Sequence, residues 1–522
     1  MPKLTRREFL LSLAALPALK LALPSLELLP AAHRLSGPAS QSAADQPNFL
    51  VIVFDALSAQ HIPTFGYQRD TMPNLTRLTE KATVFNQHYA SANFTTAGTA
   101  SLLTGLYPWT HRAIQYYGHT RWSVADNNIF RLLPDEYYKV AYTHNPLASA
   151  LLHQFQDGID QLEARSKHAL TDGLWSDVLF ANDFPVSIYA ERVITGLHSR
   201  PPSAPYLQFL NLLRFRSESE KYEKAFAEQF PRSLPDAEFD ALFRLEDVTD
   251  WLSELTTTVA TPYFMYIHMF PPHAPYNTRA DFVDIFNDGW QPIEKATNPM
   301  EAENVGLQRM LDARRYYDEF IAYVDAEFGR LYDQLEKSGA LDNTYLILTA
   351  DHGELFERGI VGHGGTAMYD GVTHVPLMVW KPGQQQRVDV HQRTSAVDLV
   401  PTLLHLTGQP TPDLCEGTVL PTFSDAADPS DRSIFALEAK LNNSFAPLTV
   451  GTTAFYHGPH KLVHYMGYEN SPSEEGYYEL FNLANDPEEL ENLVDSNKTV
   501  ARDMKEQLAQ KIDEVNRPFR RA

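Results

Sequence analysis

Acidic and imidazole side chains follow two apolar runs of the sequence. Asp55 comes directly after the run Asn48–Phe54, and Asp351 and His352 come just after the run Thr344–Thr349. Carboxylate oxygens and an imidazole nitrogen can bind a divalent cation, and Ca²⁺, Mn²⁺ and Zn²⁺ all fit this set. Taken singly, each residue has an ordinary explanation, because an aspartate after a strand often caps a helix and Asp-His-Gly is a common turn. Together they predict one divalent-cation site.

A second stretch, residues 90–105, is rich in small and hydroxyl-bearing side chains and ends in Ala100-Ser101-Leu102-Leu103-Thr104-Gly105. It resembles the signature of the sulfatase family, within the alkaline-phosphatase superfamily. That signature reads cysteine or serine, any residue, Pro, Ser, Arg, Ala, a small residue, Leu, Leu, Thr, Gly. Other segments match the family in its order, and the resemblance covers about residues 47–495. These segments include Asp55-Ala56-Leu57, Thr71-Met72-Pro73-Asn74-Leu75, His273-Ala274-Pro275-Tyr276, Asp351-His352-Gly353-Glu354 and Glu479-Leu480-Phe481-Asn482-Leu483.

The sequence departs from this signature at its reactive position. Family members convert the signature cysteine or serine to formylglycine, but Thr95 stands there and threonine has no route to that aldehyde. We therefore expect no formylglycine in this chain. Ala97 and Thr99 replace the signature proline and arginine, and loss of the arginine removes a charge that would support the nucleophile.

An unmodified threonine is nevertheless compatible with catalysis. Related phosphoethanolamine transferases and lipoteichoic-acid synthases use a metal-bound threonine, so the resemblance implies Thr95 as both nucleophile and metal ligand, beside Asp55, Asp351 and His352. A coordinating dication lowers the pKa of the hydroxyl and polarises the substrate. A phosphothreonine can be discharged by a second in-line attack, whereas a sulfated threonine is harder to discharge at sulfur. Thr95 thus favours phosphoric over sulfuric esters.

The neighbouring Thr96 is the alternative nucleophile. It would take that role if the turn were shifted by one residue. The unbroken spacing to Leu102-Leu103-Thr104-Gly105 favours Thr95.

Several histidines and one asparagine complete the predicted site. His273 and His363 match positions at which relatives hold the anion or protonate the leaving oxygen, which an imidazole of pKa about 6.5 can do. His144 and Asn145 lie where relatives supply polar substrate contacts, although a surface turn explains them equally well. His268 is expected to face the other side of its strand, as a core histidine.

The pattern of apolar runs indicates an α/β fold. Besides the two runs above, 263–268 and 375–380 are continuously apolar, as strands buried on both faces are. Open α/β sheets bind ligands at the carboxyl ends of their strands, where the polar residues lie. The resemblance implies an alkaline-phosphatase-like central mixed β-sheet flanked by helices, with a smaller C-terminal α+β domain. A final amphipathic helix is expected over about 499–515.

The expected division of the chain follows from shifts in composition. We expect a signal peptide over 1–32, a linker over 33–46, a sulfatase-like catalytic domain over 47–410 and a C-terminal subdomain over 411–522. Residues 154–255 are helical in period and rich in charge, and are expected to form a helical insertion.

The N-terminus carries a sequence typical of export. Arg6 and Arg7 precede the apolar stretch Phe9–Leu19, which is too short to cross a bilayer. The pattern resembles a twin-arginine signal peptide, so we expect the twin-arginine export machinery as a partner and a periplasmic or extracellular location. A short amphipathic anchor is the alternative.

Composition excludes several classes of protein. The chain has 522 residues, 43% of them hydrophobic, which is enough for a large core. With 43 basic and 66 acidic residues the net charge is −23, which makes nucleic acid an unfavourable partner. The one cysteine, Cys415, permits neither an internal disulfide nor a thiolate zinc site.

The sequence therefore predicts an exported, metal-dependent hydrolase of sulfuric or phosphoric esters. Its substrate would be an anionic ester on a glycan, a lipid or a small molecule. Two alternatives stay open. One is a transferase that passes a phospho-alcohol group to a glycan or lipid acceptor, and the other is a non-catalytic binding protein with the same fold.

Overall fold

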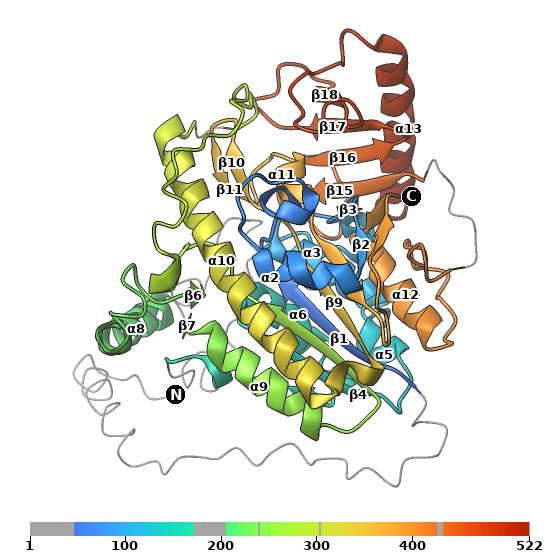
Figure 1. Ribbon diagram of the computed structural model, residues 1–522. Helices are drawn as coiled ribbons and strands as arrows, with labels where there is room; N and C mark the ends of the chain where they lie inside the picture. The colour runs from blue at the N-terminus through green and yellow to red at the C-terminus, as the bar shows by residue number, and fades with distance from the viewer. Residues whose placement is uncertain (1–45, 172–204, 238–240, 302–303, 425–431, 521–522) are drawn as a thin grey trace, which may run out of the picture. The chain divides into compact units, whose positions relative to one another are not determined.

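A mixed sheet of eight strands lies at the centre of the computed structural model (Figure 1). Strand β12 is antiparallel to both of its neighbours, and the other paired strands of this sheet are parallel. In spatial order the strands are β13 (Val388–Val390), β2 (Thr83–Phe85), β12 (Leu377–Trp380), β9 (Thr344–Thr349), β1 (Asn48–Phe54), β8 (Tyr263–Met269), β4 (Tyr138–Thr143) and β5 (Gln161–Leu162).

The structure describes residues 46–171, 205–237, 241–301, 304–424 and 432–520. The predicted signal peptide and nearly all of the predicted linker lie outside these ranges. The expected central mixed sheet is confirmed, and the four runs that were predicted to be strands are β1, β8, β9 and β12. Strand β12 begins two residues later than expected, after Pro376, because proline cannot donate to the ladder.

The alternation of side chains along β1 explains how helices cover both faces of the sheet. Leu50, Ile52 and Phe54 pack on one side, and Phe49 and Val51 pack on the other. Each fully buried side chain of this size contributes roughly 1.5–3 kcal/mol to folding. The first face is covered by α2 (Pro73–Leu78), α9 (Leu245–Thr258) and α10 (Leu307–Ser338), and the second by α3 (Thr95–Thr104), α5 (Ile129–Leu132), α6 (Pro146–Gln154) and α12 (Leu399–Leu406) (Figure 1).

A second, antiparallel sheet is built from the C-terminal part of the chain. It has the order β15 (Ile434–Glu438), β16 (Gly451–His457), β17 (His460–Met466), β18 (Tyr477–Asn482). The predicted terminal helix is α13 (Lys498–Asn516), whose apolar side chains cover one face of this sheet. Shorter elements are α4 (Pro108–His111), α8 (Pro205–Ala225), α11 (Asp370–Thr373) and the strand pairs β3 (His88–Tyr89) with β14 (Thr394–Ser395), β6 (Asp236–Ala237) with β7 (Ala241–Leu242) and β10 (Leu355–Glu357) with β11 (Ile360–Gly362).

The region 154–255 is only partly helical. Helices α8 and α9 lie within it, but so do β5, which forms the edge of the main sheet, and the hairpin of β6 and β7. Strands of two residues are too short to give a hydrophobic period, and the charged sequence around them resembles a helix surface. Residues 172–204 of this region lie outside the described part. None of the described helices combines the length and the apolar character that crossing a bilayer requires.

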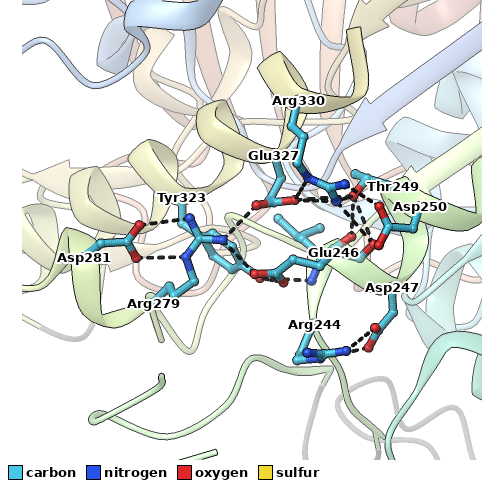
Figure 2. A network of polar contacts seen from close by, with 11 residues as sticks. Arg244, Glu246, Asp247, Thr249, Asp250, Arg279, Asp281, Tyr323, Glu327 and Arg330 are labelled. Carbon is cyan, nitrogen blue, oxygen red and sulfur yellow. Dashed lines mark hydrogen bonds and ion pairs between the residues drawn. The ribbon is translucent and has the colours of Figure 1, made fainter. Parts of the chain in front are cut away.

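Arginine side chains link the segment after β8 to helices α9 and α10 by hydrogen bonds and ion pairs (Figure 2). Arg279 donates to Glu246 of α9 at 2.7 Å and to Glu327 of α10 at 2.8 Å. It also makes two parallel hydrogen bonds to Asp281, at 2.8 and 2.9 Å. Paired geometry of this kind makes arginine–carboxylate contacts stronger than ordinary hydrogen bonds. Since α9 and α10 are far apart in sequence, Arg279 stabilises their packing as well as the position of its own segment.

We expect Arg279→Leu to lower the free energy of unfolding by about 2–3 kcal/mol, because it leaves the carboxylates of Glu246 and Glu327 without their partner. The matched control is Arg77→Leu, which removes an exposed pair with Asp333 at 3.2 Å. An exposed pair contributes under about 1 kcal/mol. Urea unfolding of the two variants checks this, and equal losses would contradict the role given to Arg279.

Candidate active site

Three neighbouring strands deliver the central side chains of the site. Asp55 follows β1 and Asp351 follows β9, and these two strands are parallel neighbours, so their carboxyl ends lie side by side. Strand β8 borders β1 on the other side and carries His268 next to its last residue. All three side chains are fully buried.

The predicted position of His268 is wrong. Its Nε2 lies 3.4 Å from Asp55 Oδ2 and 3.7 Å from Asp351 Oδ2, so it belongs to the acidic cluster. The reason lies in the alternation along β8. Phe264 and Tyr266 face the α3 side of the sheet, and His268 continues that parity onto the side where Thr95 lies. The sequence does indicate that His268 shares a face with Phe264 and Tyr266, because alternate residues of a strand point the same way. It does not indicate that α3 packs on that face.

Asp55, His268 and Asp351 form a candidate cation site. One ligand atom from each residue lies within 4.8 Å of the other two. Asp55 Oδ1, His268 Nε2 and Asp351 Oδ2 are buried and lack a hydrogen-bond partner of good geometry among the described residues. Buried polar atoms are rarely left in this way. Converging oxygens and a nitrogen without such partners are what a bound divalent cation satisfies.

The electrostatics of the two aspartates lead to the same conclusion. Burial and the charge of Asp55 raise the pKa of Asp351 to about 7. Burial also opposes ionisation of Asp55, but the nearby His273, His268 and His352 outweigh it and hold the pKa of Asp55 below its ordinary value. Two carboxylates this close cannot both ionise without a compensating positive charge.

His352 presents a lone pair to the same place. Its Nδ1 lies 2.9 Å from the carbonyl oxygen of Gly353, to which it donates, and this leaves Nε2 as the unprotonated nitrogen. Nε2 lies 3.4 Å from Asp55 Oδ1 and 3.6 Å from Asp351 Oδ2. Burial and the neighbouring His363 hold the pKa of His352 well below its ordinary value, so the ring stays neutral and able to bind a metal.

Thr95 opens helix α3 and faces this cluster. Its Oγ1 lies 3.3 Å from His352 Nε2 and 3.3 Å from Asn145 Nδ2. Phe94 precedes it as a cap that supplies no side-chain hydrogen bond. The N–H groups of the first helical turn are therefore available, and together with the helix dipole they favour an anion at this end.

Asn145 fixes the position of both Thr95 and Asp55. It caps helix α6, where its Oδ1 accepts from the N–H groups of Leu147 at 2.7 Å and Ala148 at 3.3 Å. This orients Nδ2 toward Asp55 Oδ2 and Thr95 Oγ1. His144, by contrast, packs in an aromatic layer, stacked on Phe243 with ring centroids 4.1 Å apart.

A glycine lets α3 approach the backbone at Asp351 closely. A Cβ added at Gly98 would lie 2.3 Å from the backbone oxygen of Asp351, closer than any side chain allows. The helix that carries Thr95 thus rests directly on the backbone that carries Asp351. Gly98 stands where the signature has serine, so this close contact accompanies a third departure from the signature, beside Ala97 and Thr99.

His363 and His273 extend the site away from the aspartates. The ring centroids of His352 and His363 are 4.2 Å apart, and those of His363 and His273 are 4.7 Å apart. His363 Nδ1 lies 2.8 Å from Oε1 of the buried Glu354. Burial opposes the charged form of His363, but Glu354 outweighs it and raises the pKa of His363 above its ordinary value. Glu354 lies in the quoted Asp-His-Gly-Glu segment, but its partnership with His363 has no signal in the sequence.

The structure thus gathers Asp55, Thr95, Asn145, His273, Asp351, His352 and His363 from the predicted set and adds His268 and Glu354. Thr96 Oγ1 is buried and has no hydrogen-bond partner among the described residues, which sets it apart from Thr95. His144 is adjacent in sequence to Asn145 but makes its packing contacts elsewhere.

Comparisons with known proteins identify the family of the chain. The family model "Sulfatase" matches residues 47–409, and the model "N-sulphoglucosamine sulphohydrolase, C-terminal" matches residues 365–517. The uncharacterized sulfatase YidJ of Escherichia coli is 22% identical, with 91% of this chain and 89% of the relative covered. Arylsulfatase K of Xenopus laevis is also 22% identical, over 52% of this chain and 55% of the relative.

Among solved structures, the phosphonate monoester hydrolase of Agrobacterium radiobacter shares the fold, with a TM-score of 0.64 and 20% sequence identity. The similarity covers 90% of this chain and 96% of that one. Because the sulfatase model spans well over half of the sequence, the chain belongs to the sulfatase family of the alkaline-phosphatase superfamily and is a hydrolase that acts on ester bonds.

Proposed function

We propose that this hydrolase cleaves phosphoric or phosphonic esters, with Thr95 as the nucleophile and one divalent cation in the site. The carrying observation is the position of Thr95 Oγ1, 3.3 Å from both His352 and Asn145, at the first turn of α3. An unmodified hydroxyl stands where sulfatases carry formylglycine, and a hydroxyl nucleophile is better suited to phosphorus than to sulfur. The phosphonate monoester hydrolase named above has the same fold, so this fold is compatible with action on a phosphorus ester.

The residues that would hold the cation are Asp55, Asp351, His352 and Thr95, with His268 as a further candidate ligand. Their oxygen and nitrogen atoms converge, and three of them lack good partners among the described residues. A bound dication would polarise the ester and lower the pKa of the Thr95 hydroxyl. The donor set is compatible with Ca²⁺, Mn²⁺ or Zn²⁺.

The residues of the chain account for both halves of the reaction. The Thr95 hydroxyl gives its proton to solvent and its oxygen attacks phosphorus, the bond from phosphorus to the leaving oxygen breaks, and a protonated histidine gives that oxygen a proton. Water then attacks the phosphothreonine and passes one proton to the same histidine, the bond from phosphorus to the Thr95 oxygen breaks, and that oxygen takes a proton from solvent to restore the hydroxyl. The free N–H groups at the start of α3 stabilise the negative charge on the transferred group.

His363 and His273 are placed to manage that proton and the anion. Glu354 orients His363 through Nδ1 and favours its protonated form, which suits a proton donor. His273 lies beside it, with its Nδ1 2.7 Å from the carbonyl oxygen of Ala274. That contact makes Nδ1 the donor, and the other ring nitrogen is left to face substrate. Asn145 is the proposed polar contact to substrate, whereas His144 stacks on Phe243.

We expect Thr95→Ala to reduce kcat by about a thousandfold or more, because it removes the attacking oxygen. Thr96→Ala is the matched control, since Thr96 is the next residue of the same helix and is equally buried. The measurement uses phosphate monoesters, phosphodiesters, phosphonate monoesters and sulfate monoesters with each variant. The proposal predicts the highest kcat/KM on a phosphorus ester.

The same assay separates the alternatives. Product formed only after an acceptor alcohol is added would select the phospho-alcohol transferase. Absence of turnover on all four ester classes, with metal bound, would select the binding protein. Loss of activity in Thr96→Ala with retention in Thr95→Ala would overturn the assignment of the nucleophile.

We also expect His268→Gln to weaken binding of Mn²⁺ by roughly 10–100-fold, since the imidazole faces both aspartates. His144→Gln provides the control, because it changes a histidine that is equally buried but stacked on Phe243. Titration with Mn²⁺ after removal of bound metal by a chelator gives both affinities. An unchanged affinity in His268→Gln would remove it from the ligand set.

We further propose that the protein is exported and acts in the periplasm or outside the cell. We expect the double change Arg6→Lys and Arg7→Lys to leave uncleaved protein in the cytoplasm, because the twin-arginine pathway reads this pair. Arg34→Lys makes the same chemical change outside the pair and should not alter export. Cell fractionation with N-terminal sequencing measures this, and normal export of the double variant would contradict the twin-arginine assignment.

A further inference from the structure

A cavity lies apart from the candidate active site. It has a volume of about 740 Å³, within the range of roughly 300–1,000 Å³ that small-molecule sites occupy. Its walls come from the loops around 60–68 and 290–295, from α11 and from the turns at 391–393, 458–459 and 483–488. None of its described lining residues belongs to the candidate active site.

Glutamine side chains are one group of polar residues that line this cavity. Gln60, Gln87, Gln291 and Gln392 all line it, and within the described residues their side-chain amides make no hydrogen bond to protein. A carboxamide offers donors and an acceptor together. The hydroxyl groups of a sugar are also both donors and acceptors, so four unengaged amides around one cavity fit a polyhydroxylated ligand.

Aromatic rings lie at the same cavity. Trp290 and Tyr67 line it, with ring centroids 5.5 Å apart in an edge-to-face arrangement. Trp290 Nε1 donates to Gln68 Oε1 at 2.8 Å, which fixes the indole. Such rings combine a large apolar face with a polar edge, as binding to the C–H face of a sugar ring requires. Arg69 lies over Trp290, 4.8 Å from a ring centroid, so a sugar would pack on the opposite face of the indole.

Two arginines of the lining form no ion pair with a carboxylate among the described residues, although Arg393 also lies over the ring of Tyr456, 5.9 Å from its centroid. Arg314, 9% exposed, donates to the carbonyl oxygen of Phe356 at 3.1 Å, and Arg393 donates to that of Gly458. The Nε atom of each is buried without a hydrogen-bond partner among the described residues. A guanidinium of this kind is suited to a carboxylate or sulfate group.

The carboxylates of the lining already have cations of their own. Glu357 and Glu488 pair with Lys295 at 2.7 and 2.8 Å. Asp370 pairs with Lys461 at 2.7 Å. They therefore leave the two arginines available to an anionic group of a ligand.

We propose that this cavity binds an oligosaccharide that carries a carboxylate or sulfate group, through the glutamines, Trp290 and the two arginines. The bound sugar is not the ester that Thr95 attacks, so the proposal does not depend on the reaction.

The test uses the full chain with Thr95→Ala, so that hydrolysis cannot alter the ligand. Isothermal titration compares a hexuronate trisaccharide, an O-sulfated trisaccharide, a neutral hexose trisaccharide and inorganic sulfate. We expect one trisaccharide to bind per chain. Each charged trisaccharide should bind at least about tenfold more tightly than the neutral one, because hydrogen bonds to charged groups are stronger. Inorganic sulfate alone should bind weakly, and added inorganic phosphate should not displace the hexuronate.

Arg393→Gln should weaken binding of the charged trisaccharides about tenfold. Arg387→Gln, a nearby arginine that pairs with Asp389 at 2.8 Å outside the cavity, is the matched control and should have little effect. Gln392→Ala, at an exposed position, provides a second variant if Arg393→Gln does not fold. The proposal would be overturned if Arg393→Gln or Gln392→Ala bound the charged trisaccharides as tightly as the parent does. It would also be overturned if phosphate displaced the hexuronate, or if the neutral trisaccharide bound as tightly as the charged ones.

Discussion

The repulsion between two buried carboxylates is the constraint on which the rest of this site depends. Asp55 and Asp351 stand at the ends of adjacent parallel strands, fully buried, and their pKa values are pushed in opposite directions. Histidines lie around them, but Asp55 Oδ1 and Asp351 Oδ2 have no hydrogen-bond partner among the described residues. A pair of this kind is stable when one member is protonated or when a cation lies between them, and the converging atoms without hydrogen-bond partners among the described residues favour the cation.

The fold meets this constraint with few elements. The order β9, β1, β8 brings two aspartates and His268 to one edge of the sheet, and β1 lies in the middle. Helix α3 then rests on the Asp351 backbone at Gly98, which places Thr95 at the same edge with the positive end of the helix toward it. Thr95, the two aspartates and the first N–H groups of α3 are therefore positioned by backbone packing, and Asn145 links α6 to Thr95 and Asp55.

Much of this could be predicted from the sequence, for identifiable reasons. Continuous apolar runs gave the central strands β1, β8, β9 and β12, and Asp55 and Asp351 follow from strands ending at one edge. His268 could not be placed correctly, since the choice between the two faces of β8 depends on where α3 packs. The pairing of Glu354 with His363, and the edge strand β5, depend on tertiary contacts that leave no period in the sequence. The capping role of Asn145, which orients its amide toward Thr95, was likewise visible only in the structure.

The central claim is that the transferred group becomes attached to Thr95, and its most direct test is to look for that adduct. The metal-loaded enzyme is mixed with a phosphorus ester, quenched in acid within the first turnover, digested and analysed by tandem mass spectrometry. The account predicts that the peptide containing residues 90–105 gains the mass of one phosphoryl or phosphonyl group, located on Thr95. Turnover without any such adduct, or an adduct on Thr96 or on a histidine, would contradict it.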